Sequence, residues 1–107
     1  MKTTKQLLGA RIKELRKVRM LSQEQLAELI GVEPRHMSRI EVGQSYPSLD
    51  RLEKIAQTLN VPLKDFFDFL HLKEAEDRLD DIREMSKSLS EEHQKIVFRF
   101  LRVLMEL

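Results

Sequence analysis

The chain has 107 residues, which suits one small domain or one domain with an appendage. It contains no cysteine, and this excludes a disulfide framework, a Cys-ligated zinc site and a thiol nucleophile. Charged residues make up 35% and hydrophobic residues 41%, a mixture that can bury a core and argues against disorder. No apolar run approaches the ~18 residues of a membrane span. We therefore expect a folded cytoplasmic protein with no membrane partner.

The two parts of the chain differ in charge, although the whole chain carries only +1. Residues 1–70 have a net charge of +3, and residues 71–107 have a net charge of −2. The segment from Lys2 to Arg19 holds seven basic residues and a single acid, Glu14. A basic first part suits an anionic partner that binds there, but a solvated helix face would give the same charge pattern.

Glycine and proline indicate a similar division of the chain. All three glycines and all three prolines lie within the first 62 residues, and only serines interrupt the helical pattern after Pro62. We expect several short helices with tight turns in residues 1–70 and one or two longer helices in residues 71–107. No stretch alternates with a period of two, so the predicted fold class is all-α.

The first two predicted helices follow from apolar spacing and capping residues. The first covers residues 4–18, with Thr4 as its expected cap. The second covers residues 23–30, with Ser22 as N-cap and Gly31 as a left-handed C-terminal stop. The apolar residues expected to face the core in these two helices are Leu8, Ile12, Leu15, Leu26, Ala27 and Ile30.

Three further helices are predicted after this stop. Pro34 suits the first position of the third helix, which buries Met37 and Ile40 and is closed by Gly43. A fourth helix begins at residue 48 or 49, and residues 60–62 turn the chain into a fifth. The apolar residues expected to face inward in the fourth and fifth helices are Leu52, Ile55, Ala56, Leu59, Leu63, Phe66, Phe67 and Leu70.

Residues 23–40 combine a helix, a turn too short to be a linker and a second helix. Ala27 is small at the point where the two helices would cross, and a packed interior tolerates little added volume there. On the second helix, Arg35 and Arg39 lie four residues apart and therefore share one face. Two exposed arginines, flanked by hydroxyl and imidazole donors, suit the edges of guanine bases and phosphate groups.

This stretch closely resembles the helix-turn-helix of the Cro and phage-repressor-like (XRE) transcriptional regulators. The resemblance rests on residues 21–32 (LSQEQLAELIGV), residues 38–44 (SRIEVGQ) and residues 47–61, and it covers about residues 5–70. It implies a five-helix, lambda-repressor-like DNA-binding domain over residues 1–70, whose recognition helix, residues 34–42, enters the major groove. It also implies an ion pair between Arg16 and Glu41 that ties the first helix to the third.

The resemblance assigns base reading to the recognition helix and phosphate contacts to its surroundings. The sequence departs from the family at two positions. Glu33 replaces the usual small hydroxyl cap, and it could cap the helix, accept from a cytosine amino group or repel phosphate. Pro34 offers no donor, so hydrogen-bonded base reading should shift to Arg35 and Arg39. The residues assigned to DNA binding are Gln23, Glu33, Pro34, Arg35, His36, Ser38, Arg39, Gln44 and Ser45.

Residues 71–107 have no place in the minimal DNA-binding fold. Apolar residues follow a heptad-like register from Leu72 to Leu89, and Ser88 or Ser90 begins a last helix. The apolar arc of that last helix is too wide for a surface helix. These helices either pack back onto the same chain or form a homodimer, and we favour the homodimer. The residues predicted for its interface are Leu79, Ile82, Ile96, Val97, Phe98, Phe100, Leu101, Leu104 and Met105.

The sequence thus predicts a sequence-specific transcriptional regulator, and in particular a repressor that binds a palindromic operator in double-stranded DNA as a homodimer. Two alternatives remain, namely an antitoxin that autoregulates its operon and a protein-interaction adaptor that does not bind DNA. No catalytic signature is present, and His36, His71 and His93 have no ligand spacing, so we expect no enzymatic activity, metal or cofactor. A signal would act through a regulatory protein partner, through protein concentration or through dissociation of the dimer.

Overall fold

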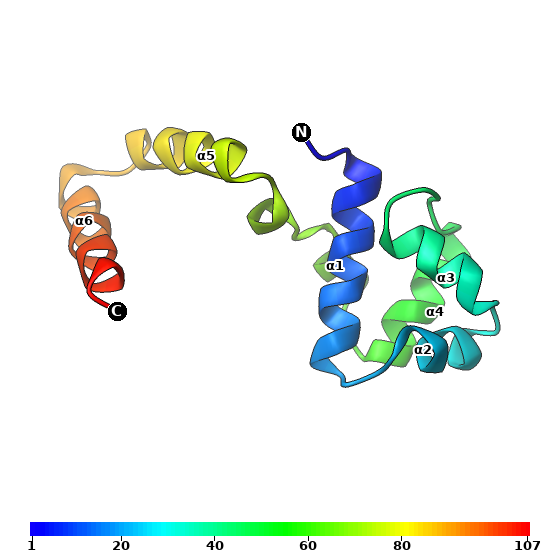
Figure 1. Cartoon of the computed structure of the whole chain (residues 1–107). Coiled ribbons are helices and arrows are strands. Elements are labelled where there is room, and N and C mark those ends of the chain that lie inside the picture. The colour runs from blue at the N-terminus through cyan, green and yellow to red at the C-terminus, as the bar shows by residue number, and fades with distance from the viewer. The chain divides into compact units, whose positions relative to one another are not determined.

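A computed structural model describes all 107 residues of the chain, and every regular element in it is helical. The chain divides into two compact units, Met1–Glu74 and Ala75–Leu107, whereas the sequence placed the boundary after residue 70. The first unit contains α1 (Thr4–Val18), α2 (Gln23–Ile30), α3 (Pro34–Glu41), α4 (Leu49–Leu59) and the short 3-10 helices η1 (Leu63–Phe67) and η2 (Leu70–Leu72) (Figure 1). The second unit contains α5 (Ala75–Lys87) and α6 (Glu91–Met105). None of these helices combines the length and the apolar character that a bilayer crossing requires.

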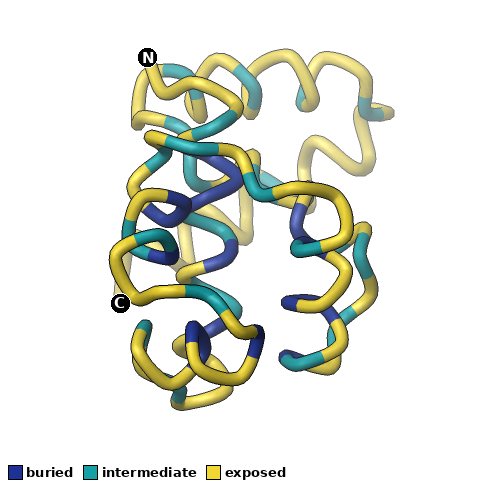
Figure 2. Tube along the Cα trace, turned by 90° about the vertical axis from the view of Figure 1, so that its right-hand side faces the viewer, coloured by how far each residue is buried: buried dark blue, intermediate teal, exposed yellow.

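The core of the first unit lies where α1, α2, α3 and α4 meet. Figure 2 shows the buried positions as short dark-blue stretches along otherwise exposed helices, as expected for amphipathic helices that each bury one side. Every core residue predicted in these four helices is buried except Leu15, which is partly buried against the cluster. The largest side chains with almost no exposed surface are Phe66, Ile12, Leu26, Met37, Ile40, Ile55 and Leu59.

Capping residues fix where the helices of this unit begin. Ser22 and Ser48 cap α2 and α4 as predicted, with each hydroxyl accepting from the backbone N–H three residues on. The expected cap of α1 was wrong by one residue. Thr3, not Thr4, is the N-cap, because its hydroxyl accepts from Gln6 N–H while the Gln6 side chain accepts from Thr3 N–H. This reciprocal pair satisfies two backbone donors, and a cap at Thr4 would leave it unformed.

Gly9 allows α1 and α3 to approach each other more closely than any other residue would. A Cβ atom at Gly9 would lie 2.2 Å from the carbonyl oxygen of Ile40 and 2.7 Å from that of Glu41. Both distances are far below van der Waals contact, and both neighbours are backbone atoms, which cannot rotate away. The position of α3 against the body of the unit therefore depends on a missing side chain in α1.

The fifth predicted helix is a 3-10 helix, and two of its predicted core residues were placed wrongly. Phe66 is fully buried, but Phe67 and Leu70 are more than half exposed. An α-helical period would put residues 63, 66, 67 and 70 on one face, whereas a 3-10 helix turns 120° per residue and directs Phe67 away from Phe66. Phe69 packs against the core in place of Leu70, with its ring centroid 6.5 Å from that of Phe67.

Polar contacts hold the segment of η1 and η2 against α1. Arg11 Nε donates to the carbonyl oxygen of Asp65 at 2.8 Å. Glu14 accepts hydrogen bonds from Arg11 and from His71 Nε2. Burial raises the pKa of Glu14, but the hydrogen bonds from His71 and Arg11, together with their positive charges, outweigh this effect and hold its pKa below the ordinary value.

The second unit consists of α5 and α6, neither of which buries a residue. Ser90 is the N-cap of α6, so the second of the two predicted starting serines is correct. Gln94 Nε2 donates to the carbonyl oxygen of Ser86 at 2.8 Å, which joins the start of α6 to the end of α5. An open groove of about 330 Å³ lies between the two helices, and it is lined by Arg83, Ser86 and Lys87 of α5 and by Gln94, Val97, Phe98 and Leu101 of α6.

Candidate nucleic-acid interface

α2 and α3 form a helix-turn-helix. Ala27 has no exposed surface, as expected at the crossing of the two helices. Gly31 ends α2 in the left-handed conformation with φ of 77°, and Val32 N–H donates to Ala27 O at 2.9 Å, which closes the end of α2. Only two residues, Val32 and Glu33, then separate Gly31 from Pro34, the first residue of α3. The turn is therefore rigid, and it fixes the direction of α3 relative to α2.

One face of α3 is buried against the rest of the unit, and the opposite face is exposed. Its buried residues are Met37, Ile40 and Glu41. Arg35 and Arg39 are exposed on the opposite face, since they lie about 180° from the centre of the buried side at 100° per residue. Val42, which caps the end of α3 and is 56% exposed, lies on the same outward face. Val42 is not among the residues predicted for DNA binding, although its spacing from Arg35 and Arg39 indicates this outward position. Pro34 is exposed at the start of α3, and Ser38 is partly buried beside the arginines.

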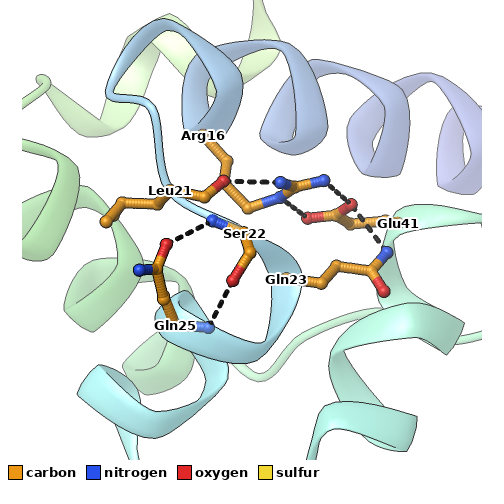
Figure 3. A network of polar contacts seen from close by, with 6 residues as sticks. All are labelled: Arg16, Leu21, Ser22, Gln23, Gln25 and Glu41. Carbon is orange, nitrogen blue, oxygen red and sulfur yellow. Dashed lines mark hydrogen bonds and ion pairs between the residues drawn. The ribbon is translucent and has the colours of Figure 1, made fainter.

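A buried ion pair anchors the end of α3 to α1 (Figure 3). Arg16 Nε lies 2.7 Å from Glu41 Oε2, and Arg16 Nη2 lies 2.9 Å from Glu41 Oε1, a bidentate geometry. Arg16 Nη1 donates to Leu21 O at 2.6 Å, so all three guanidinium nitrogens have partners. The ion pair that the family resemblance implied is therefore confirmed, and it holds the end of α3 in place.

Gln23 joins this network from the first position of α2. Its Nε2 donates to Glu41 Oε1 at 2.9 Å. A carboxylate can only accept, so Glu41 fixes which end of the Gln23 amide faces inward. The amide nitrogen carries two hydrogens, and this contact uses one of them. Gln23 can therefore keep its bond to Glu41 and donate its second N–H outward.

Glu33 does not cap α3. It occupies the N-cap position, but its side chain makes no capping hydrogen bond. This rules out the first of the three roles considered for it and leaves an exposed carboxylate at the start of α3. An acidic side chain there is compatible with accepting from a base donor or with repelling a phosphate.

The loop after α3 is held against α1. Gly43 adopts φ of 82°, and a Cβ atom on it would lie 2.5 Å from Gln6 Cγ. Gln44 N–H donates to Arg39 O at 2.9 Å, while the side chain of Gln44 is exposed and that of Ser45 is partly buried. The ammonium group of Lys5 lies 5.1 Å from the ring centroid of Tyr46. These contacts place two polar side chains next to the C-terminal end of α3.

His36 has a partner that was not predicted from the sequence. Its Nε2 lies 2.8 Å from Nη1 of Arg51, which is in the first turn of α4. The two residues line an open hollow of about 420 Å³ together with Glu33, Arg35 and Arg39. No short-range pattern could reveal this pair, because its two residues are 15 positions apart and belong to different helices.

Arg19, one of the basic residues near the end of α1, has an intramolecular role. Its Nε donates to Leu59 O at 2.7 Å and its Nη2 donates to Asn60 O at 3.2 Å. It therefore satisfies carbonyl groups at the C-terminal end of α4, where a positive charge also interacts favourably with the helix dipole.

The residues predicted for a dimer interface all lie in the second unit. Val97 is partly buried, and the other eight are exposed, from 42% for Ile82 to 81% for Met105. At 100° per residue, the charged side chains of α6 occupy one arc, and its apolar side chains, together with His93 and Gln94, occupy the rest of the helix. The charged arc consists of Glu91, Glu92, Lys95, Arg99, Arg102 and Glu106.

Comparison with known proteins agrees with this geometry. The helix-turn-helix family HTH_3 matches residues 12–66, which include α2, α3 and α4 completely. The chain belongs to this family. It is 37% identical over 75 residues to the HTH-type transcriptional regulator SinR of Bacillus subtilis, and the match covers 69% of this chain and 68% of SinR. An uncharacterized regulator from Sinorhizobium medicae is 36% identical over 61 residues, and the match covers 57% of this chain and 44% of that relative. The family and these relatives are transcriptional regulators and not enzymes, as the sequence predicted.

Two solved structures of SinR extend the comparison. A complex of SinR with DNA superposes with a TM-score of 0.53 at 36% identity and covers 56% of this chain and 97% of that one. The complex of the SinR protein with the SinI protein superposes with a TM-score of 0.56 at 26% identity and covers 94% of this chain and 99% of that one. The second likeness is long enough to include both α5 and α6. The chain is therefore a helix-turn-helix, DNA-binding transcriptional regulator with an all-α fold.

Proposed function

We propose that this regulator is a repressor that binds a palindromic operator as a homodimer, with α3 in the major groove of each half-site. The observation that carries the proposal is the pair of exposed arginines, Arg35 and Arg39, on the outward face of a helix whose other face is buried. Bound protein would exclude the polymerase from the promoter. Since the target is chromosomal or phage DNA, we place the protein in the cytoplasm.

The proposed contacts divide into base reading and positioning. Arg35 and Arg39 can each donate two hydrogen bonds to the O6 and N7 atoms of a guanine. Gln23 presents its second amide hydrogen at the N-terminus of α2, where free backbone N–H groups also favour a phosphate. Gln44 and Ser45 offer polar side chains to the backbone beyond the other end of α3. Positioning contacts to phosphate then set the register in which the two arginines read bases.

We propose that α5 and α6 form the homodimer interface. Every large apolar side chain of α6 except Val97 is at least 44% exposed in the single chain, and exposed apolar surface of this extent is unfavourable in water. A second copy offers the same apolar arc, and a two-fold interface is self-complementary. The negative net charge of residues 71–107 suits a position away from the phosphates.

A two-fold dimer constrains the spacing of the two half-sites of the operator. Two recognition helices in successive major grooves on the same side of the duplex are about 34 Å apart, one turn of DNA. We therefore expect a palindrome whose half-sites are spaced by about ten base pairs or a multiple of this number.

The same two helices would be the site for a regulatory protein partner. The likeness to SinR in its complex with SinI spans 94% of this chain, and apart from dimerisation α5 and α6 have no role in the proposed mechanism. A partner that carried a similar apolar helix would compete with the second copy of the chain. It would thereby lower the affinity for a two-half-site operator without touching α3.

Selection of bound sequences from a random duplex library, with purified full-length protein at near-physiological salt, tests the proposal. We expect a palindromic motif with the spacing given above. The double variant Arg35→Ala/Arg39→Ala should lose at least about 30-fold in affinity for that motif, because each lost bidentate contact removes roughly 1–3 kcal/mol. The matched control is Arg99→Ala/Arg102→Ala, which removes two arginines from the charged arc of α6 and should leave operator affinity unchanged.

Three results would count against the proposal. Enrichment of no sequence above background would favour the antitoxin or the adaptor. Operator affinity that survives loss of Arg35 and Arg39 would show that another surface reads the bases. A motif without two-fold symmetry would contradict the homodimer on DNA while leaving specific binding intact.

A further inference from the structure

His36 and Arg51 meet on the flank of α3 that faces the start of α4. The guanidinium Nη1 of Arg51 lies 2.8 Å from Nε2 of His36, within hydrogen-bonding distance. His36 lies about 100° around the helix from Arg35, so it is beside the outward face and not at its centre. The base-reading and phosphate contacts proposed above give Arg51 no role.

The contact determines which ring nitrogen of His36 carries a hydrogen. A guanidinium group has five N–H donors and no acceptor. Nε2 of His36 must therefore accept the hydrogen bond, which requires that this nitrogen has no hydrogen of its own. In a neutral imidazole the hydrogen is then on Nδ1. Arg51 thus selects the tautomer in which His36 has a donor, Nδ1–H, available for a further partner.

The position of Arg51 is fixed by the start of α4. Ser48 Oγ accepts from Arg51 N–H at 3.1 Å, which sets the first turn of the helix. The next residue, Leu52, and then Ile55 are buried in the core, so α4 cannot rotate to withdraw Arg51. The backbone of Arg51 is consequently fixed beside α3, and the hydrogen bond to His36 is the contact of its partly buried side chain.

We propose that Arg51 is a positioning residue for DNA binding, and that it holds His36 in the Nδ1–H tautomer so that His36 donates to a backbone phosphate oxygen at the edge of the groove. The proposal rests on the proposed function, since it assumes that α3 enters the major groove. A phosphate is the acceptor because the residues at the centre of the outward face, Arg35 and Arg39, already face the bases. His36 on the flank faces the wall of the groove, which the sugar–phosphate backbone forms.

Nitrogen-15 NMR of the imidazole rings tests the first half of the proposal on the free, full-length protein. The two tautomers of a neutral imidazole give distinct ring-nitrogen shifts. We expect Nδ1–H for His36 in the wild type and loss of this preference in Arg51→Met. Arg51→Lys should retain it, because an ammonium group is also a donor without an acceptor.

A double-mutant cycle on DNA affinity tests the second half. Loss of a hydrogen bond to a charged phosphate should weaken binding by about tenfold in either Arg51→Met or His36→Ala. If Arg51 acts through His36, adding Arg51→Met to His36→Ala should cause no further loss. The matched control is Lys54→Met, which removes a cation from the same helix without a bond to His36, and it should leave the His36 tautomer unchanged. Because the acceptor is a phosphate, the loss should be equal for the operator and for an unrelated duplex.

Several outcomes would overturn the proposal, and they differ from those that would overturn the proposed function. An Nε2–H tautomer in the wild type would remove its chemical basis, whether or not the protein binds DNA. Additive losses in the double variant would mean that Arg51 contacts DNA by itself. A loss confined to operators with one particular base pair would assign His36 to base reading. If the protein selects no DNA motif at all, the proposed function fails, and the tautomer measurement still shows whether Arg51 controls His36.

Discussion

Substituting Gly9 with alanine should destabilise the first unit, although alanine is the better helix former of the two residues. In an isolated helix this change would stabilise by about 1 kcal/mol. Here the new Cβ atom would lie 2.2 Å from the carbonyl oxygen of Ile40, whereas ordinary van der Waals contact begins at 3.4 Å. α1 and α3 would therefore have to separate by about 1 Å, because neither carbonyl group can move independently of its helix.

The magnitude follows from what this separation does to the core. A gap of about 1 Å removes between a quarter and a half of the dispersion energy of the atom pairs across it, and the pairs here include Ile12 on α1 and Ile40 on α3, both fully buried. Overpacking of a core usually destabilises by about 1–3 kcal/mol, and a clash with backbone belongs at the upper end of this range. After subtraction of the helix-propensity gain, we expect a net loss of about 2 kcal/mol.

Urea denaturation of the full-length protein, followed by circular dichroism, measures this loss as a lower transition midpoint at unchanged slope. The matched control is the pair Lys13→Ala and Lys13→Gly at an exposed position of the same helix. There alanine should be the more stable by about 1 kcal/mol, which isolates the propensity contribution. If Gly9→Ala unfolds at the same or a higher urea concentration than the wild type, the argument from close helix approach is wrong.

Three other changes test separate parts of the structure. Glu41→Ala leaves Arg16 buried without its carboxylate partner and should lower the free energy of unfolding by about 3–5 kcal/mol. The double variant Arg16→Met/Glu41→Leu removes both charges and should recover most of that loss. A loss below about 1 kcal/mol in the single variant would contradict this reasoning. Glu14 has a pKa below its ordinary value, because hydrogen bonds and positive charge outweigh burial, so it contributes stability at neutral pH that disappears as the pH falls through its folded-state pKa. Glu14→Gln should therefore weaken the acid dependence of the urea midpoint, and an unchanged pH profile would refute the assignment. Leu101→Glu should convert the proposed homodimer into a monomer in sedimentation experiments, whereas Arg99→Glu on the charged arc of α6 should leave the dimer intact. Equal behaviour of the two variants would count against the proposed interface.

The parts of the fold that depend on residues close together in the sequence could be predicted from the sequence. Ser22, Gly31 and Ser48 each carry out their function within four residues of their own position, so a helix start or stop is visible in a short window. The α-helical core residues also follow from local spacing, because the helical period directs every third or fourth residue to one face.

The prediction failed where the local geometry changed or where two distant segments met. Phe67 and Leu70 were assigned to the core on an α-helical period, but this segment forms the two 3-10 helices η1 and η2, and both side chains are exposed. Gly9 was treated only as a break in the pattern, because nothing in α1 alone reveals how close α3 lies. Arg51 has no distinguishing neighbour in the sequence, and its contact with His36 depends on the packing of α4 against α3.

The buried and the exposed residues of α3 have different functions. A helix of eight residues has little stability by itself, so its position must come from contacts with the rest of the unit. Those contacts are made by Met37 and Ile40 in the core, by Glu41 with Arg16, and by the backbone of α3 against Gly9. Arg35 and Arg39 take part in none of them, so substitutions at these two positions can change what is bound without changing how α3 is held. A variant with altered residues at these positions should therefore keep the stability of the wild type and bind a different operator.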